Sequence, residues 1–503
     1  MNIVNIMNFV RGVEPRNPSL DLLAPVLGQI ALNKRFGFEN TFLLQYDAII
    51  DKKFSDVFLA ERDEKTELGV WIEIVRPLVE KVGIAWRGRP GYDWDWHVDP
   101  GFLPSYTYEQ KTLLIDELME KFREVFGEYP KSAGSWLLDI DSVRYMSEKY
   151  GVKAFGICRE QLGVDAYTLW GGPYNQPYFP SKNNILCPAS TKENELHAPV
   201  FRLLGIEPIR GYWETRYAND PKCGGCATME PVWKYGQDKD YMRWFFECYF
   251  DKENLGIAYT QIGQENSFGW KAMKDGLAMQ YELLREYADA GKVEVMKMCD
   301  AGERFAETYE MTPPAALVAE EDAPINGKRY RSFWYTGKYY RANVMFDRDR
   351  LYFRDIQKYD EKLREPYLDA PCLDWKAEYY ALPVVNERIW CTENDDADLE
   401  FEGKYEYLRT ERDGGALVVY AKAEGSADET AIRLDEKCIT VTGGETRLAW
   451  SFGSFDGATV NADGADFTFD GTNYRVGLTA DSVATDGGKT EIKGKTIKLG
   501  MAE

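Results

Sequence analysis

The stretch GSWLLDIDSVRYMSEKYGVKAFGIC, residues 134–158, contains the unit from which we predict the fold. An apolar run reaches Asp139, a helical pattern follows, Gly151 stands where that helix should end, and a second apolar run leads to Cys158. Glycine directly after a helix is typical of a left-handed C-terminal cap, and apolar runs without alternation suit strands that are covered on both faces. The stretch therefore predicts strand, helix and strand in a parallel sheet.

The same unit, a helical pattern closed by glycine and followed by an apolar run, recurs along the first half of the chain, at Gly37, Gly205, Gly256 and Gly291. Further apolar runs lie at 2–10, near 70 and at 132–139, so that about eight strands are expected before residue 300, the number in a (β/α) barrel. An open doubly wound sheet is the alternative.

The character of the sequence changes after residue 315. Aromatic, strand-like segments follow, and from Glu400 short strands are separated by Gly and Asp turns that are typical of hairpins. We predict the α/β class, with a (β/α)7-8 barrel followed by an all-β, sandwich-like domain. The expected divisions are 1–315 for the barrel, 316–395 for a linker and aromatic strand-rich connector, and 396–503 for the β domain.

Composition limits the partners. The 503 residues carry a formal net charge of -22, which would repel phosphate backbones and anionic membrane surfaces. We therefore expect a small-molecule or oligosaccharide substrate, and neither nucleic acid nor membrane as a partner. A homo-oligomer is compatible with the same features.

Cysteine and histidine usage limits the chemistry. Nine cysteines without a small-scaffold spacing suggest reduced thiols, and the N-terminal residues lack the pattern of a signal peptide, so a cytoplasmic location is expected. The chain has two histidines, and Cys223 and Cys226 lack a second cysteine pair at zinc spacing. No Walker loop or dinucleotide fingerprint is present. We predict no metal site and no cofactor.

Polar residues follow nearly every predicted strand of the barrel, where the active sites of such barrels lie. In chain order these residues are Arg11 and Glu14, Gln45 and Asp47, Glu73, Asp139 and Asp141, Arg159, Glu160 and Gln161, and Gln261 and Glu265.

Asp139 and Asp141 allow two interpretations. If the strand continues to residue 141, both side chains share one face, because side chains alternate along a strand. If it stops near Leu138, Asp141 caps the helix that begins near Ser142, since Asp is a favoured N-cap residue.

Two long loops, at 86–106 and 165–181, are rich in aromatic residues. Trp94, Trp96 and His97 lie in the first loop and Trp170 in the second. Flat aromatic faces beside carboxylates suit sugar rings, which stack through their C–H faces and donate hydrogen bonds from their hydroxyls. The alternative is that the two loops pack against each other as a lid.

The order of the segments NFVRGVEPR, QYDAI, GSWLLDIDSVRYMSEKYGV and GQEN resembles the glycoside hydrolase/deacetylase superfamily, especially gut-bacterial members with a barrel and a β-rich tail. The resemblance covers roughly the first 310 residues and implies a (β/α)7-type barrel that acts on carbohydrate. It implies by position a nucleophile at Asp139 and an acid at Glu265. The deacetylases of the superfamily use an Asp, which Asp47 could match, and a pair of histidines on a metal, which this sequence lacks.

We therefore predict a glycoside hydrolase with Asp139 and Glu265 as its catalytic carboxyl groups, both directed into the barrel mouth. The reaction needs two such groups, about 5 Å apart for retention and about 6.5–9.5 Å for inversion. A metal-dependent carbohydrate deacetylase and a non-catalytic carbohydrate-binding protein are the alternatives. The expected substrate-binding residues are Arg11, Glu14, Asp47, Glu73, Trp94, Trp96, His97, Asp141, Glu160, Gln161, Trp170 and Gln261.

Overall fold

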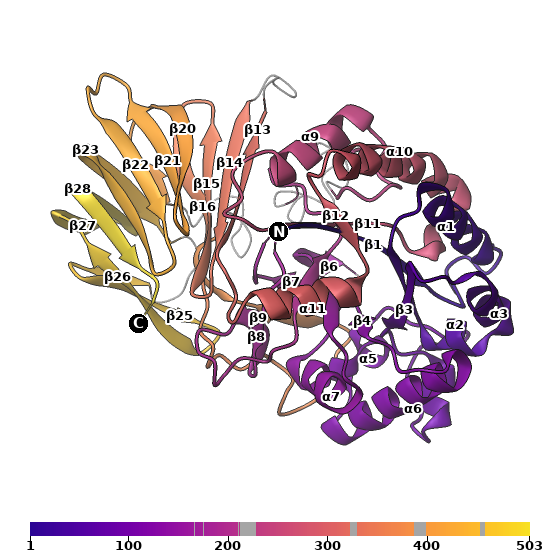
Figure 1. The fold of residues 1–503 in the computed structure, drawn as a ribbon. Coiled ribbons are helices and arrows are strands. Elements are labelled where there is room, and N and C mark those ends of the chain that lie inside the picture. Colours follow the sequence, from indigo (N-terminus) through magenta and orange to yellow (C-terminus); the bar gives the residue numbers. More distant parts are fainter. Residues whose placement is uncertain are drawn as a thin grey trace.

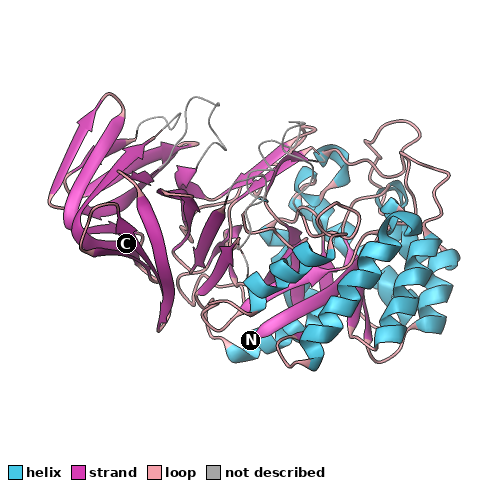
Figure 2. Ribbon diagram, turned by 90° about the horizontal axis from the view of Figure 1, so that it is seen from above, coloured by secondary structure: helices cyan, strands magenta, loops and turns pink. Residues whose placement is uncertain are grey.

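The computed structural model of the chain describes residues 1–164, 166–174, 176–209, 211, 228–321, 329–386, 399–452 and 458–502. Two bodies lie side by side in Figure 1, a ring of strands and helices on the right and a body of strands on the left. Figure 2 shows the same division from above, with nearly all helices in the first body.

The first body is a parallel, nearly closed barrel, as predicted. Its strands follow the order β10-β5-β4-β3-β2-β1-β11, and β12 also pairs with β1. Their bounds are β1 (Asn2–Val10), β2 (Asn40–Leu44), β3 (Thr66–Trp71), β4 (Ser132–Gly134), β5 (Ala154–Cys158), β10 (Val200–Leu203), β11 (Ala258–Ile262) and β12 (Glu294–Met296).

Side chains span the gap between the first and last strands of this order. The side-chain oxygen of Gln261 on β11 accepts a hydrogen bond from the backbone N–H of Leu204 at 2.8 Å. The rings of Phe201 on β10 and Tyr259 on β11 lie 5.0 Å apart. These contacts bring the two edge strands together, which is the arrangement of a barrel and not of an open sheet.

Helices surround the barrel (Figure 1). They are α1 (Leu23–Phe36), α2 (Tyr46–Ile50), α3 (Lys52–Glu61), α4 (Arg76–Lys81), α5 (Val98–Gly101), α6 (Tyr108–Phe126), α7 (Ile140–Tyr150), α9 (Lys239–Phe250), α10 (Trp270–Asp289) and α11 (Met298–Thr308), with short 3-10 helices at Leu103–Ser105 and Asn266–Phe268. Gly37 and Gly151 end α1 and α7 with φ of 65° and 69°, as the left-handed cap requires. No helix in the described parts of the chain is both long and apolar enough to cross a membrane.

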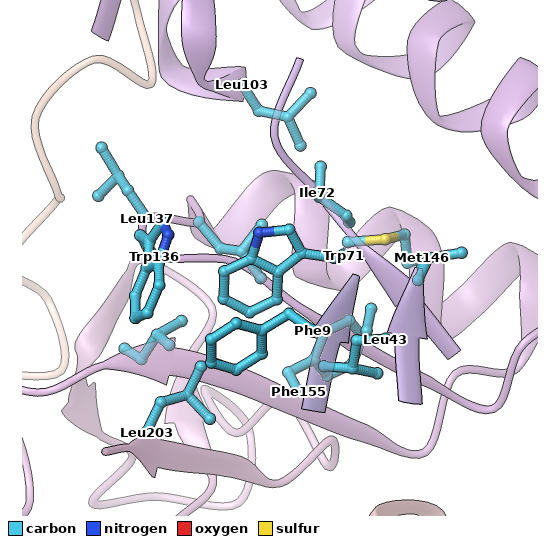
Figure 3. Close-up of a cluster of buried hydrophobic side chains, with 14 of the residues drawn as sticks. Phe9, Leu43, Trp71, Ile72, Leu103, Trp136, Leu137, Met146, Phe155 and Leu203 are labelled. Carbon is cyan, nitrogen blue, oxygen red and sulfur yellow. The ribbon is translucent and has the colours of Figure 1, made fainter. Parts of the chain in front are cut away.

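The barrel core reaches up to the carboxyl ends of the strands. Figure 3 shows Phe9, Trp71 and Trp136 packed together with aliphatic side chains from neighbouring strands. The rings of Phe9 and Trp71 stack at 4.2 Å, and Trp136 meets both edge-on at 5.0 Å. This packing fixes the indole of Trp71 at the end of β3, two residues before the acidic residue Glu73.

Small sheets join the loops that follow the barrel strands to a later segment. β6 (Gln161–Val164) and β7 (Tyr167–Trp170) form a hairpin, and β17 (Ala377–Tyr380) pairs with β7 in parallel. β8 (Pro180–Ser181) pairs with β9 (Asn184–Pro188). The connector after the barrel therefore returns to the barrel loops.

The second body is an antiparallel sheet of 15 strands, which confirms the predicted all-β region. Its strands are β13 (Ala315–Glu320), β14 (Tyr330–Thr336), β15 (Tyr340–Asp347), β16 (Arg350–Lys358), β18 (Leu382–Asn386), β19 (Leu399–Phe401), β20 (Tyr405–Asp413), β21 (Ala416–Ala423), β22 (Glu429–Leu434), β23 (Cys438–Ser451), β24 (Thr459–Asn461), β25 (Gly464–Phe469), β26 (Thr472–Thr479), β27 (Ser482–Asp486) and β28 (Lys489–Gly500).

This sheet curls back on itself around one apolar core. Tyr407 on β20 contacts Phe333 on β14 at 5.3 Å and Phe346 on β15 at 5.8 Å, although these strands lie far apart in the strand order. β13 to β16, part of the expected connector, belong to the same sheet as the later strands. The expected division between residues 395 and 396 lies outside the described residues.

Candidate active site

Arg11 is the centre of a buried cluster of acids at the carboxyl ends of the barrel strands. It follows β1, and its guanidinium binds Glu73 through two hydrogen bonds of 3.0 Å. The same guanidinium lies 3.4 Å from Oε2 of Glu265 and 3.8 Å from Oε2 of Glu14. One positive charge thus faces three carboxyl groups that come from three different strand ends.

Glu73 is the most firmly held of these acids. Besides Arg11, it accepts hydrogen bonds from Nε1 of Trp71 at 2.9 Å and from Nε2 of Gln45 at 3.3 Å. Burial raises the pKa of Glu73 to about 7, against the opposing effect of Arg11 and with a further rise from the charge of Glu265. Because Glu73 is fully buried and its oxygens accept several hydrogen bonds, its role is to position Arg11 and not to contact a substrate.

Glu265 has an unengaged oxygen. Its Oε1 accepts a hydrogen bond from the hydroxyl of Ser267. Its Oε2 is buried and has no hydrogen-bond partner among the described residues, apart from the ion contact with Arg11. A buried carboxylate oxygen without a hydrogen bond is available to a ligand, and Oδ2 of Asp47 is a second such oxygen in this region.

Glu14 lies where this cluster opens to a cavity. The cavity has a volume of about 330 Å³ and is lined by residues of the 12–22 segment, by residues 51–54 at the start of α3, and by Gly91 and Asp93. Burial by itself would raise the pKa of Glu14, but the hydrogen bonds and charge of Arg16, together with Arg11, lower it overall. Glu14 is therefore an ionised carboxylate on the cavity wall.

Asp47 lies beside the same segment. Its Oδ1 accepts hydrogen bonds from the backbone N–H groups of Gly12 at 3.0 Å and Ala48 at 2.7 Å. Burial raises the pKa of Asp47 to about 6, although these bonds and the charge of Arg11 oppose the rise. Asp47 thus holds the chain at Gly12, next to Arg11.

Glu230 also belongs to the cluster and was missed by the sequence reasoning. It accepts hydrogen bonds from Gln264 at 2.9 Å, from Thr228 at 2.7 Å and from Trp233 at 3.1 Å. Burial is the main reason why its pKa is raised, and the charge of Glu265 adds to the rise. No predicted strand precedes Glu230, so the search along strand ends could not find it.

The aromatic loop 86–106 reaches this cluster. The guanidinium of Arg11 lies 4.0 Å from the ring of Trp94, and that of Arg16 lies 5.3 Å from the ring of Trp96. Trp94 is 1% exposed, so its ring supports Arg11 from within the protein. Trp96 is partly exposed, and the next residue, His97, binds Asp95 at 2.7 Å.

Asp139 and Asp141 lie outside this cluster. Of the two interpretations, the shared strand face is wrong, because β4 ends at Gly134 and both residues stand at the start of α7. Asp139 caps α7, accepting from the backbone N–H of Ser142 at 3.0 Å, and lies 3.1 Å from Nζ of the buried Lys111. The hydroxyl of Ser142 also donates to Asp139 at 2.8 Å, and Asp141 pairs with Arg144 in α7.

The remaining predicted residues lie towards the β domain or in the barrel wall. Glu160 binds Arg341 of β15, whereas the amide of Gln261 spans β10 and β11. Gln161 on β6 and Trp170 on β7 are buried in the small sheet that includes β17. These four side chains build the support around the mouth of the barrel.

The described residues do not fit the metal site of a deacetylase. No group of three or more His, Cys, Asp or Glu side chains in the described parts of the chain is arranged to hold a metal ion. The two histidines bind different acids, His97 to Asp95 and His197 to Glu195, each at 2.7 Å. Cys223 and Cys226 lie outside the described residues.

A second cavity, of about 420 Å³, lies in the β domain. It is lined by Asp349, Lys404, Lys422 and neighbouring residues of β20 and β21. Asp349 and Lys404 form an exposed ion pair of 3.2 Å there. Because charged residues of this kind are ordinary on a protein surface, we keep the candidate site in the barrel.

Comparisons with known proteins agree with the fold. No family model matches the sequence, and a search of curated proteins finds no match. A structure from Parabacteroides distasonis, provisionally described as a glycoside hydrolase/deacetylase, matches with a TM-score of 0.54 and 15% identity over 76% of this chain and 90% of that chain. A provisionally described polysaccharide deacetylase from Mycobacterium smegmatis has 12% identity and a TM-score of 0.37 over 64% of this chain and 94% of that chain, which is too low for an argument. The first likeness shows that the two chains share a fold.

Proposed function

We propose that this protein hydrolyses glycosidic bonds in a neutral carbohydrate, with Glu14 and Glu265 as the two carboxyl groups. The observation that carries the proposal is the position of Glu265, whose unengaged Oε2 lies 3.4 Å from the same guanidinium that contacts Glu14. Glycosidases need such a pair on the two sides of the scissile bond.

The surroundings of the two acids suit different roles. Glu14 is kept ionised by Arg16 and Arg11 and lines the cavity, so it serves as nucleophile or base. Glu265 serves as the acid, because its buried Oε2 has no hydrogen-bond partner among the described residues and is available to the glycosidic oxygen. Glu73 holds Arg11 between the two and acts as a positioning residue.

The class of substrate is supported by charge, by the cavity and by fold. A chain with a net charge of -22 and an acidic site disfavours anionic substrates. The cavity beside Glu14 is within the usual range of about 300–1,000 Å³ for small-ligand sites. The shared fold with a chain provisionally described as a glycoside hydrolase/deacetylase favours carbohydrate among neutral substrates.

The test is a product assay with the full chain. Neutral polysaccharides, namely α- and β-linked glucans, xylan, mannan and galactan in native and acetylated form, are incubated with the protein and with Glu265→Gln. We expect new reducing ends with the wild type and none with the variant. Acetate without new reducing ends would instead indicate a deacetylase, and binding without either product would indicate a carbohydrate-binding protein; each result would overturn the proposal.

A further inference from the structure

Two large apolar side chains are exposed on one short loop, at residues 372–376, between the β domain and β17. Trp375 is 57% exposed and Leu373 is 65% exposed. The loop is nevertheless held at several points. The carbonyl oxygen of Trp375 accepts a hydrogen bond from the backbone N–H of Val98 at 3.1 Å. The backbone N–H of Cys372 donates to the carbonyl oxygen of Pro104 at 2.9 Å. A fixed loop that presents an indole to solvent is a feature of binding surfaces.

The exposed indole continues a row of rings that leads to the acids. The ring of Trp375 lies 4.2 Å from that of His97, which is stacked with Trp96 at 5.6 Å. Trp96 lies 5.9 Å from Trp94, which supports Arg11 at 4.0 Å. The row therefore runs from the surface of the connector to the guanidinium that contacts Glu14 and Glu265.

Two arginines beside the rings of this row are paired with acids. Arg89 packs on the ring of Trp96 at 4.0 Å and binds Asp95 at 2.8 Å. Arg16 binds Glu14 at 2.7 Å. Partly exposed rings bordered by neutralised polar groups favour an uncharged ligand with flat C–H faces and many hydroxyls, which is the chemistry of a neutral sugar chain.

We propose that Trp375, together with His97 and Trp96, forms an outer subsite for a neutral glycan whose inner end reaches Glu14 and Glu265. The substrate is then a chain of several sugar units and not a single sugar. The identity of the ligand rests on the function proposed above, whereas the binding surface itself does not require catalysis.

The test measures how the effect of Trp375→Ala depends on chain length. Neutral oligosaccharides of increasing length, taken from the polysaccharide that the wild type cleaves, are compared by kcat/KM. We expect the variant to lose about 2- to 10-fold on long chains, the contribution of one aromatic contact, and nothing on the shortest substrate. Trp375→Tyr should restore most of the loss. Equal kcat/KM for the wild type and Trp375→Ala at every length would overturn the proposal.

Leu373→Ala is the matched control, because it removes an exposed apolar side chain from the same loop without removing a ring. It should leave kcat/KM unchanged at every length; an equal loss in both variants would indicate a general apolar surface and overturn the glycan subsite.

Retardation in gels containing each soluble polysaccharide is measured in parallel. If no polysaccharide is cleaved but Trp375→Ala abolishes the retardation, the function proposed above fails while the glycan surface stands. If the wild type is not retarded and cleaves nothing, both fail.

Discussion

At the scale of single residues, Glu73 makes folding stability depend on pH. Burial raises its pKa from 4.5 to about 7, so the folded chain holds this proton more tightly than the unfolded chain does. Glu73 therefore contributes stability that is fully present below about pH 4.5 and is lost as the pH rises to about 7, by up to about 1.4 kcal/mol per pH unit.

Denaturant unfolding of the wild type and of Glu73→Gln between pH 4 and pH 8 checks this expectation. The free energy of unfolding of the wild type, relative to the variant, should fall through the window from about 4.5 to about 7 and become flat above it. Other titratable groups such as Asp47 are present in both proteins, so their contributions cancel in this difference. A difference that rises with pH would mean that the ion pair with Arg11 outweighs burial.

That Arg11, Glu14, Glu73 and Glu265 lie together was predictable, because polar residues directly after barrel strands meet at one end of the barrel. Which of these acids would be held by hydrogen-bond donors, and which would not, was not predictable. Only the folded chain shows that Glu73 receives donors from Arg11, Trp71 and Gln45, while Oε2 of Glu265 receives none among the described residues.

At the scale of elements, the start of α7 shows why a strand was expected to run up to Asp139. Trp136, Leu137 and Leu138 are apolar and buried, and a buried loop has the same run of apolar residues as a buried strand. Asp139 then caps the helix, a role that the residue pattern allowed for Asp141. Lys111 of α6, its ion partner, lies too far along the chain for a local pattern to reveal it.

Removing this cap should destabilise the protein without a direct effect on turnover. Asp139→Ala deletes a helix cap and removes the carboxylate that pairs with the buried Lys111, so we expect a loss of about 3 kcal/mol or more in denaturant unfolding. Lys111→Met should recover part of that loss in the double variant. Asp51→Ala, at the exposed N-cap of α3, is the control and should lose only about 1 kcal/mol. Equal losses at the two caps would show that the buried ion pair is not important.

At the scale of the whole molecule, buried charges join the two bodies. Arg341 of β15 is fully buried and binds Glu160, which follows β5 of the barrel, and Asp355 of β16 at 2.7 Å. The sequence predicted a barrel and a β domain packed on it. It could not reveal this contact, because Glu160 and Arg341 are 181 positions apart and each resembles an ordinary charged residue.

Arg341→Met should strongly destabilise the protein, because it removes the buried cation that binds two buried carboxylates, Glu160 and Asp355. We expect a loss of about 3–5 kcal/mol, seen as a lower Tm in scanning calorimetry. Arg409→Met is the matched control on β20: its side chain is 42% exposed and pairs with Glu411, so we expect a Tm close to that of the wild type. A loss of similar size in both variants would show that the buried contact does not hold the two bodies together.

The central claim, that Glu265 and not Asp139 acts on the substrate, is tested most directly by kcat of Glu265→Gln and Asp139→Asn. Both residues are buried carboxylates that follow barrel strands, and both changes are isosteric. Turnover is measured on the polysaccharide that the wild type cleaves, at a temperature where both variants are folded. We predict a loss of at least about 100-fold for Glu265→Gln and a kcat close to that of the wild type for Asp139→Asn. A folded but inactive Asp139→Asn, or a Glu265→Gln with the kcat of the wild type, would contradict the claim.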